Sequence, residues 1–292
     1  MSRQQLTLRL AAADVPRAEY LLELAGAEAL SFGDAADDPV LEPARDTAPL
    51  WPNVVLRGLF PPTADLERLG AMLRNVFPTM PIEIKTLHDA DWHGAMRQAF
   101  TARPIGTRAW LAPAEGTATP LGRTCIRLHM GLAFGTGEHP TTALCLEWLE
   151  AHVQSGVTIL DYGCGSGVLA IAALALGAIC GFAVDNDPQA LEATQANAAL
   201  NGLAERLFIG LPEALPPVIV DVLAANILAS PLIELAPQFA GQVRAGGALV
   251  LSGILETQAA QVLAAYEPFF TGFECVARSG WVRLAATRRN VG

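Results

Sequence analysis

The sequence has few charged residues and lacks an excess of basic ones. Of its 292 residues only 16% are charged, and the formal net charge is −10. Globular chains average about a quarter charged residues. With 52% hydrophobic residues, the chain has ample material for packed cores, which argues against disorder. Because a broad basic surface is absent, we expect no direct nucleic-acid binding. The acidic balance suits a basic partner or a cationic ligand, and it also serves solubility.

The chain also lacks paired cysteines and a leader-like N-terminus. Its five cysteines contain no C-x-x-C pair and are odd in number, which favours reduced thiols. The first ten residues carry Arg3 and Arg9 and no long apolar core, so no signal peptide is predicted. We therefore expect a cytoplasmic protein that does not bind membranes.

One uncharged stretch, residues 163–184, is nevertheless long enough to cross a membrane. It contains five glycines and is bracketed by Asp161 and Asp185. We interpret it as a helix (168–176), a turn and a buried strand (179–184), because the centre of a parallel sheet is often this apolar.

The length predicts two domains. Up to residue 88 the pattern predicts the order strand, helix, strand, strand, helix, strand, which is the ferredoxin-like arrangement. The six elements are expected at residues 4–11, 14–26, 29–32, 54–60, 66–77 and 82–87. This front domain (1–88) contains no catalytic constellation, so we expect it to recognise the substrate. Residues 89–125 are interpreted as a linker that begins with a helix-like segment, and residues 126–292 as the catalytic domain.

The most informative stretch, residues 159–167, has the sequence I-L-D-Y-G-C-G-S-G and joins an apolar strand to an apolar helix. Such glycines let the backbone approach a ligand, and the helix N-terminus offers unpaired N–H groups. The spacing of Gly163, Gly165 and Gly167 differs from the G-x-G-x-x-G of dinucleotide folds. It resembles motif I of the S-adenosylmethionine (SAM) methyltransferases.

An acid, Asp185, follows the next predicted strand, 182–184. At the tip of the second strand, an acid is placed to accept hydrogen bonds from both ribose hydroxyls. Motif and acid together favour a nucleoside-type cofactor over a purely structural turn. The later segments predict further alternating strands and helices that close in a hairpin around Ser279-Gly280. We therefore expect an α/β, Rossmann-like sheet of seven strands with the last strand antiparallel, as in SAM-dependent methyltransferases.

Residues 131–142, G-L-A-F-G-T-G-E-H-P-T-T, form the second informative stretch. Its close glycines predict an irregular loop, and a helix is expected to start at Pro140. Taken alone, a hydroxyl such as that of Thr142 is usually only a helix cap. We predict no metal, because E-H-P is not the zinc motif H-E-x-x-H and because His88 and His93 complete no zinc spacing.

These motifs together closely resemble the PrmA family, the methyltransferases of large-subunit ribosomal protein L-eleven. The resemblance covers essentially the full chain and includes V-D-N-D-P-Q-A and A-N-I-L-A-S-P-L. It departs at His129-Met130, where the family typically has Asp-Pro, and in the linker. The resemblance implies SAM as cofactor, that ribosomal protein as partner, and methylation of lysine side chains and of the N-terminal amine. It also implies a set of SAM-binding residues: Thr142, Gly163, Gly165, Asp185 and Asn226.

Asn226 is the candidate catalytic residue. It ends a predicted central strand, 218–225, and open α/β sheets bind ligands at the carboxyl ends of their strands. By resemblance its side chain contacts SAM and orients the target amine. The alternative role for Asn226 is that of a strand-end turn residue.

Three other functions stay open. A release-factor glutamine methyltransferase would carry Asn-Pro-Pro-Tyr, whereas Ile227 and Leu228 follow Asn226 here. A small-molecule methyltransferase would not need a dedicated front domain. A SAM-binding regulator or assembly factor without turnover is the alternative from outside the enzyme class.

Overall fold

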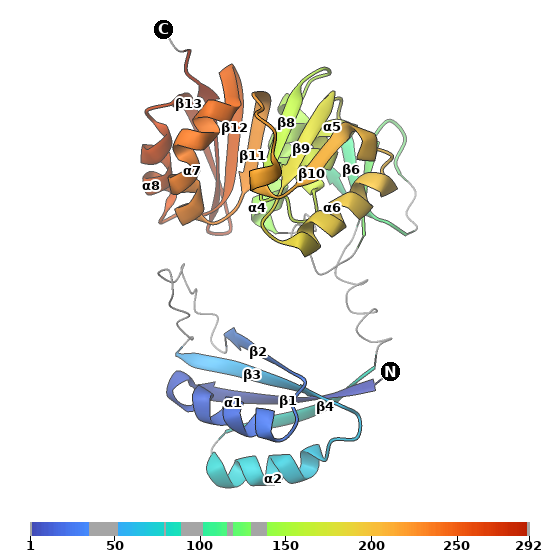
Figure 1. Cartoon of the computed structure of the whole chain (residues 1–292), viewed down its shortest axis with the longest axis vertical. Helices are drawn as coiled ribbons and strands as arrows, with labels where there is room; N and C mark the ends of the chain where they lie inside the picture. Colours follow the sequence, from blue (N-terminus) through green and yellow to red (C-terminus); the bar gives the residue numbers. More distant parts are fainter. Residues whose placement is uncertain are drawn as a thin grey trace. The chain divides into compact units, whose positions relative to one another are not determined.

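The computed structural model describes residues 2–34, 52–78, 80–88, 102–115, 119–129 and 139–290. The backbone divides into two compact units, residues 1–98 and 99–292. Each unit has its own sheet (Figure 1). Each also has its own hydrophobic core.

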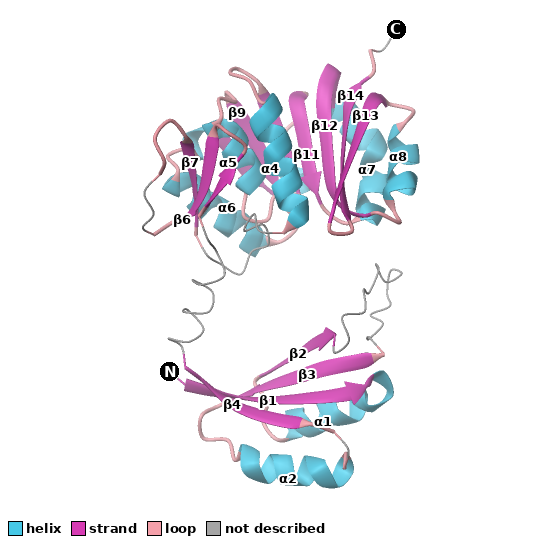
Figure 2. Ribbon diagram, turned by 180° about the vertical axis from the view of Figure 1, so that it is seen from behind, coloured by secondary structure: helices cyan, strands magenta, loops and turns pink. Residues whose placement is uncertain are grey.

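The front unit is a four-stranded antiparallel sheet with two helices on one face (Figure 2). Its strand order, β2-β3-β1-β4, confirms the ferredoxin-like prediction. The fully buried side chains of Leu6, Leu8, Leu22, Leu56 and Leu73 make the centre of its core. Its elements are β1 (Ser2–Ala11), α1 (Val15–Leu24), β2 (Ala29–Asp34), β3 (Asn53–Phe60), α2 (Leu66–Val76) and β4 (Ile82–His88).

The first helix begins differently from the prediction. A short 3-10 turn, Ala12–Asp14, precedes α1, and the Asp14 side chain makes no capping hydrogen bond. At α2 the expected type of cap is present, because Asp65 Oδ1 accepts a hydrogen bond of 3.0 Å from Arg68 N. Pro16, in the first turn of α1, therefore marks the start of the helix better than the acid does.

The second unit contains a seven-stranded sheet in the order β10-β9-β8-β11-β12-β14-β13. Strand β14 pairs antiparallel with both of its neighbours, and the other pairs in this sheet are parallel among the described residues. This confirms the predicted Rossmann-like sheet with its antiparallel last strand. The strands are β8 (Thr158–Tyr162), β9 (Cys180–Val184), β10 (Leu207–Gly210), β11 (Val220–Asn226), β12 (Val243–Leu255), β13 (Phe270–Arg278) and β14 (Trp281–Arg288).

Helices cover both faces of this sheet. One core draws residues from α4 (Pro140–His152), α5 (Val168–Ala175) and α6 (Pro188–Leu200). The core on the opposite face draws residues from α7 (Ala229–Gln242) and α8 (Ala259–Tyr266). The uncharged stretch 163–184 divides into a loop, α5 and β9, as predicted. No helix among the described residues is long and apolar enough to cross a membrane.

A small third sheet joins β5 (Arg103–Ile105), β6 (Ala109–Pro113) and β7 (Thr124–Leu128). The sequence placed residues up to 125 in a linker, but Ile105, Ala109 and Leu111 are buried in the same core as α4 and α5. The second unit therefore begins ahead of β5. The predicted helix-like segment 89–100 and the loop 130–138 lie outside the described residues.

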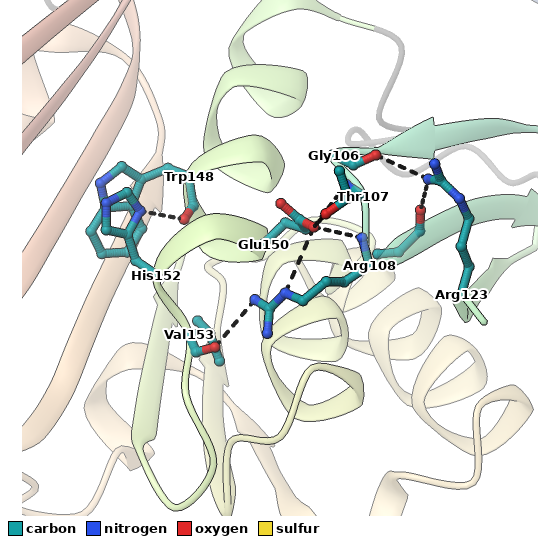
Figure 3. A network of polar contacts seen from close by, with 9 residues as sticks. Gly106, Thr107, Arg108, Arg123, Trp148, Glu150, His152 and Val153 are labelled. Atoms are coloured by element: carbon teal, nitrogen blue, oxygen red, sulfur yellow. Dashed lines mark hydrogen bonds and ion pairs between the residues drawn. The ribbon is translucent and has the colours of Figure 1, made fainter.

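A buried carboxylate attaches this small sheet to α4 (Figure 3). Glu150 Oε1 accepts hydrogen bonds from Thr107 N at 2.9 Å, Thr107 Oγ1 at 3.3 Å and Arg108 N at 2.6 Å. Arg108 Nη2 also donates to the carbonyl of Val153, just past the end of the helix. Gly106 has a φ of +52°, and a Cβ there would collide with the Glu150 carboxylate. The β5–β6 turn and the helix thus fit together only with glycine at this position.

Candidate active site

The glycine loop between β8 and α5 is held in an unusual backbone conformation. Gly163, Gly165 and Gly167 have φ values of +75°, +54° and +75°, in the left-handed region that side chains disfavour. A Cβ on Gly163 would collide with Cγ2 of Ile227, which follows β11. The N–H groups of Gly163 and Cys164 both donate to the Val184 carbonyl, at 2.8 and 3.0 Å. The loop therefore turns sharply across the ends of β8 and β9.

Asp185 lies directly beside this loop, at the end of β9. Its Oδ2 accepts a hydrogen bond from Gly165 N at 2.9 Å, and its Oδ1 accepts one from Asp187 N at 3.0 Å. Each carboxylate oxygen can accept a second hydrogen bond. The structure thus places Asp185 where the sequence predicted, with acceptor capacity left for hydroxyl groups of a ligand.

Thr142 and Asn226 form a second predicted group. Asn226 is the last residue of β11, and its Nδ2 donates to Thr142 Oγ1 at 3.1 Å. Thr142 is buried within α4, and the cap of this helix is His139, whose Nδ1 accepts from Thr141 N at 3.4 Å. The hydroxyl of Thr142 is therefore not a helix cap, because it lies against the carboxyl end of a central strand.

Two polar residues of α6 that the sequence analysis missed support the glycine loop. Thr194 Oγ1 donates to Gly165 O at 3.0 Å, and Asn197 Nδ2 donates to Ser166 O at 2.9 Å. Both side chains are buried, and Asn197 Oδ1 also accepts from His129 N at 2.8 Å. Their spacing could have revealed them. Residues three apart lie on the same face of a helix, and two polar residues on the face that packs against the core are unexpected.

Asp161, the acid next to the end of β8, is fully buried. Its Oδ2 accepts a hydrogen bond of 3.0 Å from Ala170 N in α5. Its Oδ1 is buried and has no hydrogen-bond partner among the described residues. Burial raises the pKa of Asp161 to about 7, the Ala170 N–H opposes the shift, and the charge of Asp185 adds to it.

At the start of α4 the His139 ring meets the Trp281 ring edge-on, with centroids 4.9 Å apart. Partial burial lowers the pKa of His139, which favours the neutral imidazole. Its Nδ1 lies 2.7 Å from Thr141 Oγ1. Among the described residues, no group of three or more His, Cys, Asp or Glu side chains could hold a metal ion.

These features suit one kind of ligand. An acid with free acceptor capacity at the tip of the second strand suits a ribose, and an unpartnered buried carboxylate oxygen suits a cationic group. The strand order and the left-handed glycine loop complete the pattern. Fold and site together define a SAM-dependent methyltransferase.

Comparison with known proteins identifies the family within this class. The family model described as ribosomal protein L11 methyltransferase (PrmA) matches residues 2–289. The chain therefore belongs to the ribosomal protein L11 methyltransferase family.

Relatives from several bacteria agree with this assignment. Ribosomal protein L11 methyltransferase of Pseudomonas putida (strain GB-1) is 46% identical over 276 residues, which cover 93% of this chain and 94% of the relative. The protein of the same name from Marinobacter nauticus is 44% identical over 279 residues, with 93% and 94% covered. The crystal structure of ribosomal protein L11 methylase from Lactobacillus delbrueckii subsp. bulgaricus is 30% identical, with a TM-score of 0.57. The aligned region covers 65% of this chain and 98% of the Lactobacillus chain.

Proposed function

We propose that this protein transfers methyl groups from SAM to amino groups of ribosomal protein L11, at lysine side chains and at the N-terminal amine. The observation that carries the proposal is the Asn226–Thr142 hydrogen bond at the end of β11, because it joins two family motifs beside the glycine loop. The names of the relatives support the choice of substrate. We also propose that the protein acts in the cytoplasm without binding nucleic acid, in keeping with its net charge of −10.

In this proposal five residues hold the cofactor, which supplies a methyl group on a sulfonium centre when bound. The backbone at Gly163 and Gly165 gives a side-chain-free surface for close approach. Asp185 accepts hydrogen bonds from the ribose hydroxyls. Thr142 and Asn226, which are hydrogen-bonded to each other at the end of β11, would also contact the cofactor.

Asn226 also orients the incoming amine. Its Nδ2 is committed to Thr142, so its carbonyl oxygen is left to accept a hydrogen bond from the target N–H group. Positioning of this kind is the main source of rate in a direct displacement, where no covalent intermediate is needed. A strand-end residue that only shaped a turn would not need a partner on α4.

The amine must be neutral to react, whereas free lysine has a pKa of about 10.4. Next to Asn226, Ile227 and the 55%-exposed Leu228 present apolar surface. Removing water from the ammonium group there would lower its pKa, after which solvent takes the proton.

The front domain, residues 1–88, is proposed to capture the ribosomal protein. Residues 126–292, together with β5 and β6 from the preceding stretch 89–125, are proposed to hold the catalytic machinery. The structure sets where the test fragment should begin. A start at residue 99 keeps β5 and β6, whose side chains fill the catalytic core. That fragment should bind SAM normally and lose nearly all methylation of intact L11. Full activity in the fragment would contradict a recognition role for the front domain.

The proposed function itself is tested with purified L11 and radiolabelled SAM, followed by mass spectrometry of the product. We expect methylated lysines and a methylated N-terminal amine, and loss of label transfer in Asn226→Ala. SAM binding without transfer to L11 would favour the non-catalytic assembly factor. Transfer to another protein or to a small molecule, with L11 untouched, would replace the substrate.

A further inference from the structure

Strand β8 lies within the large sheet, between β9 and β11 (Figure 1). Its Asp161 carboxylate is surrounded by the apolar layer that packs against α4 and α5. In register, Asp161 is flanked by Ala183 of β9 and Ala224 of β11, and the row continues through Val250 and Ala285. Each of these neighbours is at most 5% exposed, and Asp161 is 0% exposed. An ionised carboxylate in such surroundings has lost its hydration, so its charge is costly unless it is compensated.

Among the described residues, only one of the two carboxylate oxygens of Asp161 has a hydrogen-bond partner. Asp161 Oδ2 accepts from Ala170 N in the first turn of α5, where the N-cap residue, Gly167, has no side chain to do so. The positive end of the helix also favours the negative charge. Oδ1 remains unpartnered among the described residues. A cap needs one oxygen and could be supplied by a neutral side chain, so capping alone does not account for a buried acid.

The charges around Asp161 do not neutralise it either. Asp185, at the end of β9, adds a second negative charge. The thiols of Cys145 on α4 and Cys164 in the glycine loop are neutral, because burial raises the pKa of both. Helix α5 carries no charged residue, and the neighbour on β11 is an alanine. Arg283 of β14 acts on Cys145, but no cationic side chain of the described chain is among the groups that act on Asp161.

The missing positive charge can come from the ligand. SAM has a positively charged sulfonium, whereas the product of methyl transfer, S-adenosylhomocysteine (SAH), has a neutral thioether at the same atom. We propose that Asp161 is a charge-sensing residue of the cofactor site, ionised while SAM is bound and protonated from solvent once SAH takes its place.

This inference rests on the proposed function, because it assumes SAM as the ligand. The proton balance is simple: binding of SAM releases a proton from Asp161 to solvent, and replacement of SAM by SAH takes one back. The pKa of about 7 for the ligand-free protein supports a carboxylate that still holds its proton in slightly acidic solution. Loss of the sulfonium charge removes its attraction to the Asp161 carboxylate, so SAH is held less tightly than SAM, which favours turnover. Asp161 is a positioning and selectivity residue and takes no part in bond making.

The test is calorimetric titration of the full-length protein with SAM and with SAH at about pH 6.5, below the ~7.7–8.0 at which α-amino groups titrate. Each titration is repeated in two buffers of different ionisation enthalpy, which gives the number of protons released. We expect SAM binding to release on the order of half a proton or more, and SAH binding to release far fewer. Equal proton counts for the two ligands would overturn the proposal.

Asp161→Asn keeps the acceptor for Ala170 N and removes the charge. We expect it to abolish the difference in proton release and to shift the SAM-to-SAH affinity ratio by about tenfold toward SAH, the equivalent of one pKa unit. The matched control is Asp221→Asn. It removes a carboxylate near the amino end of β11, where Asp221 accepts hydrogen bonds from Thr158 and Arg244. This variant should change neither the proton release nor the SAM-to-SAH affinity ratio. If Asp161→Asn leaves the SAM-to-SAH affinity ratio and the proton release unchanged, Asp161 is not the charge-sensing residue. His139 would then be the source of any protons released on binding.

The wild-type measurement decides the question even if Asp161→Asn does not fold. Failure of this inference and failure of the proposed function are also distinguishable. A protein that binds neither ligand refutes the cofactor assignment, whereas one that binds both with identical proton counts refutes only the role of Asp161.

Discussion

Replacing Gly163 by alanine tests how much stability the second unit loses when the glycine loop carries a side chain at this position. Two costs are expected. A left-handed backbone costs a side chain about 1–2 kcal/mol, and Gly163 has a φ of +75°. The new methyl group would also collide with Cγ2 of Ile227, and overpacking of this kind costs about 1–3 kcal/mol. Together they predict a loss of about 2–5 kcal/mol in the stability of the second unit.

The two costs can be separated with a double-mutant cycle. Ile227→Ala removes the atom that the new methyl group meets, so Gly163→Ala should cost only the backbone part in that background. The coupling between the two sites should therefore be about 1–3 kcal/mol. Gly202→Ala is the matched control, because Gly202 has a φ of +68° and a Cβ added to it would meet no described atom within 4 Å. It should show the backbone cost alone.

Stability is measured by equilibrium chemical denaturation, and SAM affinity by calorimetry on the same samples. We expect Gly163→Ala to lower SAM affinity as well, and Ile227→Ala to restore part of it. The reasoning is refuted if Gly163→Ala costs no more than Gly202→Ala, or if its cost is the same with and without Ile227.

Four other changes have defined outcomes. Asp185→Ala should weaken SAM binding by about 1.5–3 kcal/mol, the value of a hydrogen-bonded charge; an unchanged calorimetric affinity would contradict its role at the ribose. Asn226→Ala should melt near the wild-type temperature while single-turnover methylation falls about 100-fold; an unaltered rate would make it a turn residue. The pKa of Asp161 in the folded protein is raised to about 7. The folded protein therefore loses stability as the pH rises from about 4 to 7, and the total loss above pH 7 is at most about 4 kcal/mol. Asp161→Asn should therefore gain melting temperature over wild type at pH 8 but not at pH 4, and a pH-independent difference would refute this. Glu150→Ala should destabilise the second unit by about 2–4 kcal/mol, because two backbone N–H groups lose their acceptor, whereas Glu150→Gln should lose less in the same denaturation experiment.

The order of elements and the place of the proposed cofactor residues in the fold could be predicted from the sequence because their signals are local. Gly163 and Gly165 follow an apolar strand directly, and Asp185 ends the next one, so spacing alone placed them. Thr142 was ambiguous, since a hydroxyl in a first helical turn is usually a cap. Only the tertiary structure, which sets Thr142 against Asn226 and makes His139 the cap, excludes the capping role.

What the sequence could not show depends on distant partners. Strand β5 has three residues, too few for an alternating pattern, so the start of the second unit was placed too late. Glu150 looks like an ordinary helical acid until the β5–β6 turn lies against it. Helix α7 runs through Pro237, and β12 begins at Val243 and runs through Gly246 and Gly247, although proline and glycine locally disfavour helix and strand. In each case packing overrode the local preference.

Two asparagines, Asn197 in α6 and Asn201 at its C-terminal end, occupy the exposed edge of the small sheet. Strand β7 is an edge strand, and edge strands expose N–H and C=O groups that can pair with another chain. Asn201 accepts from Arg127 N at 2.9 Å and donates to Arg127 O at 2.7 Å, while Asn197 accepts from His129 N. Two side chains thereby imitate the hydrogen bonds of a further strand. The edge is closed to association between molecules by the same helix that supports the cofactor loop.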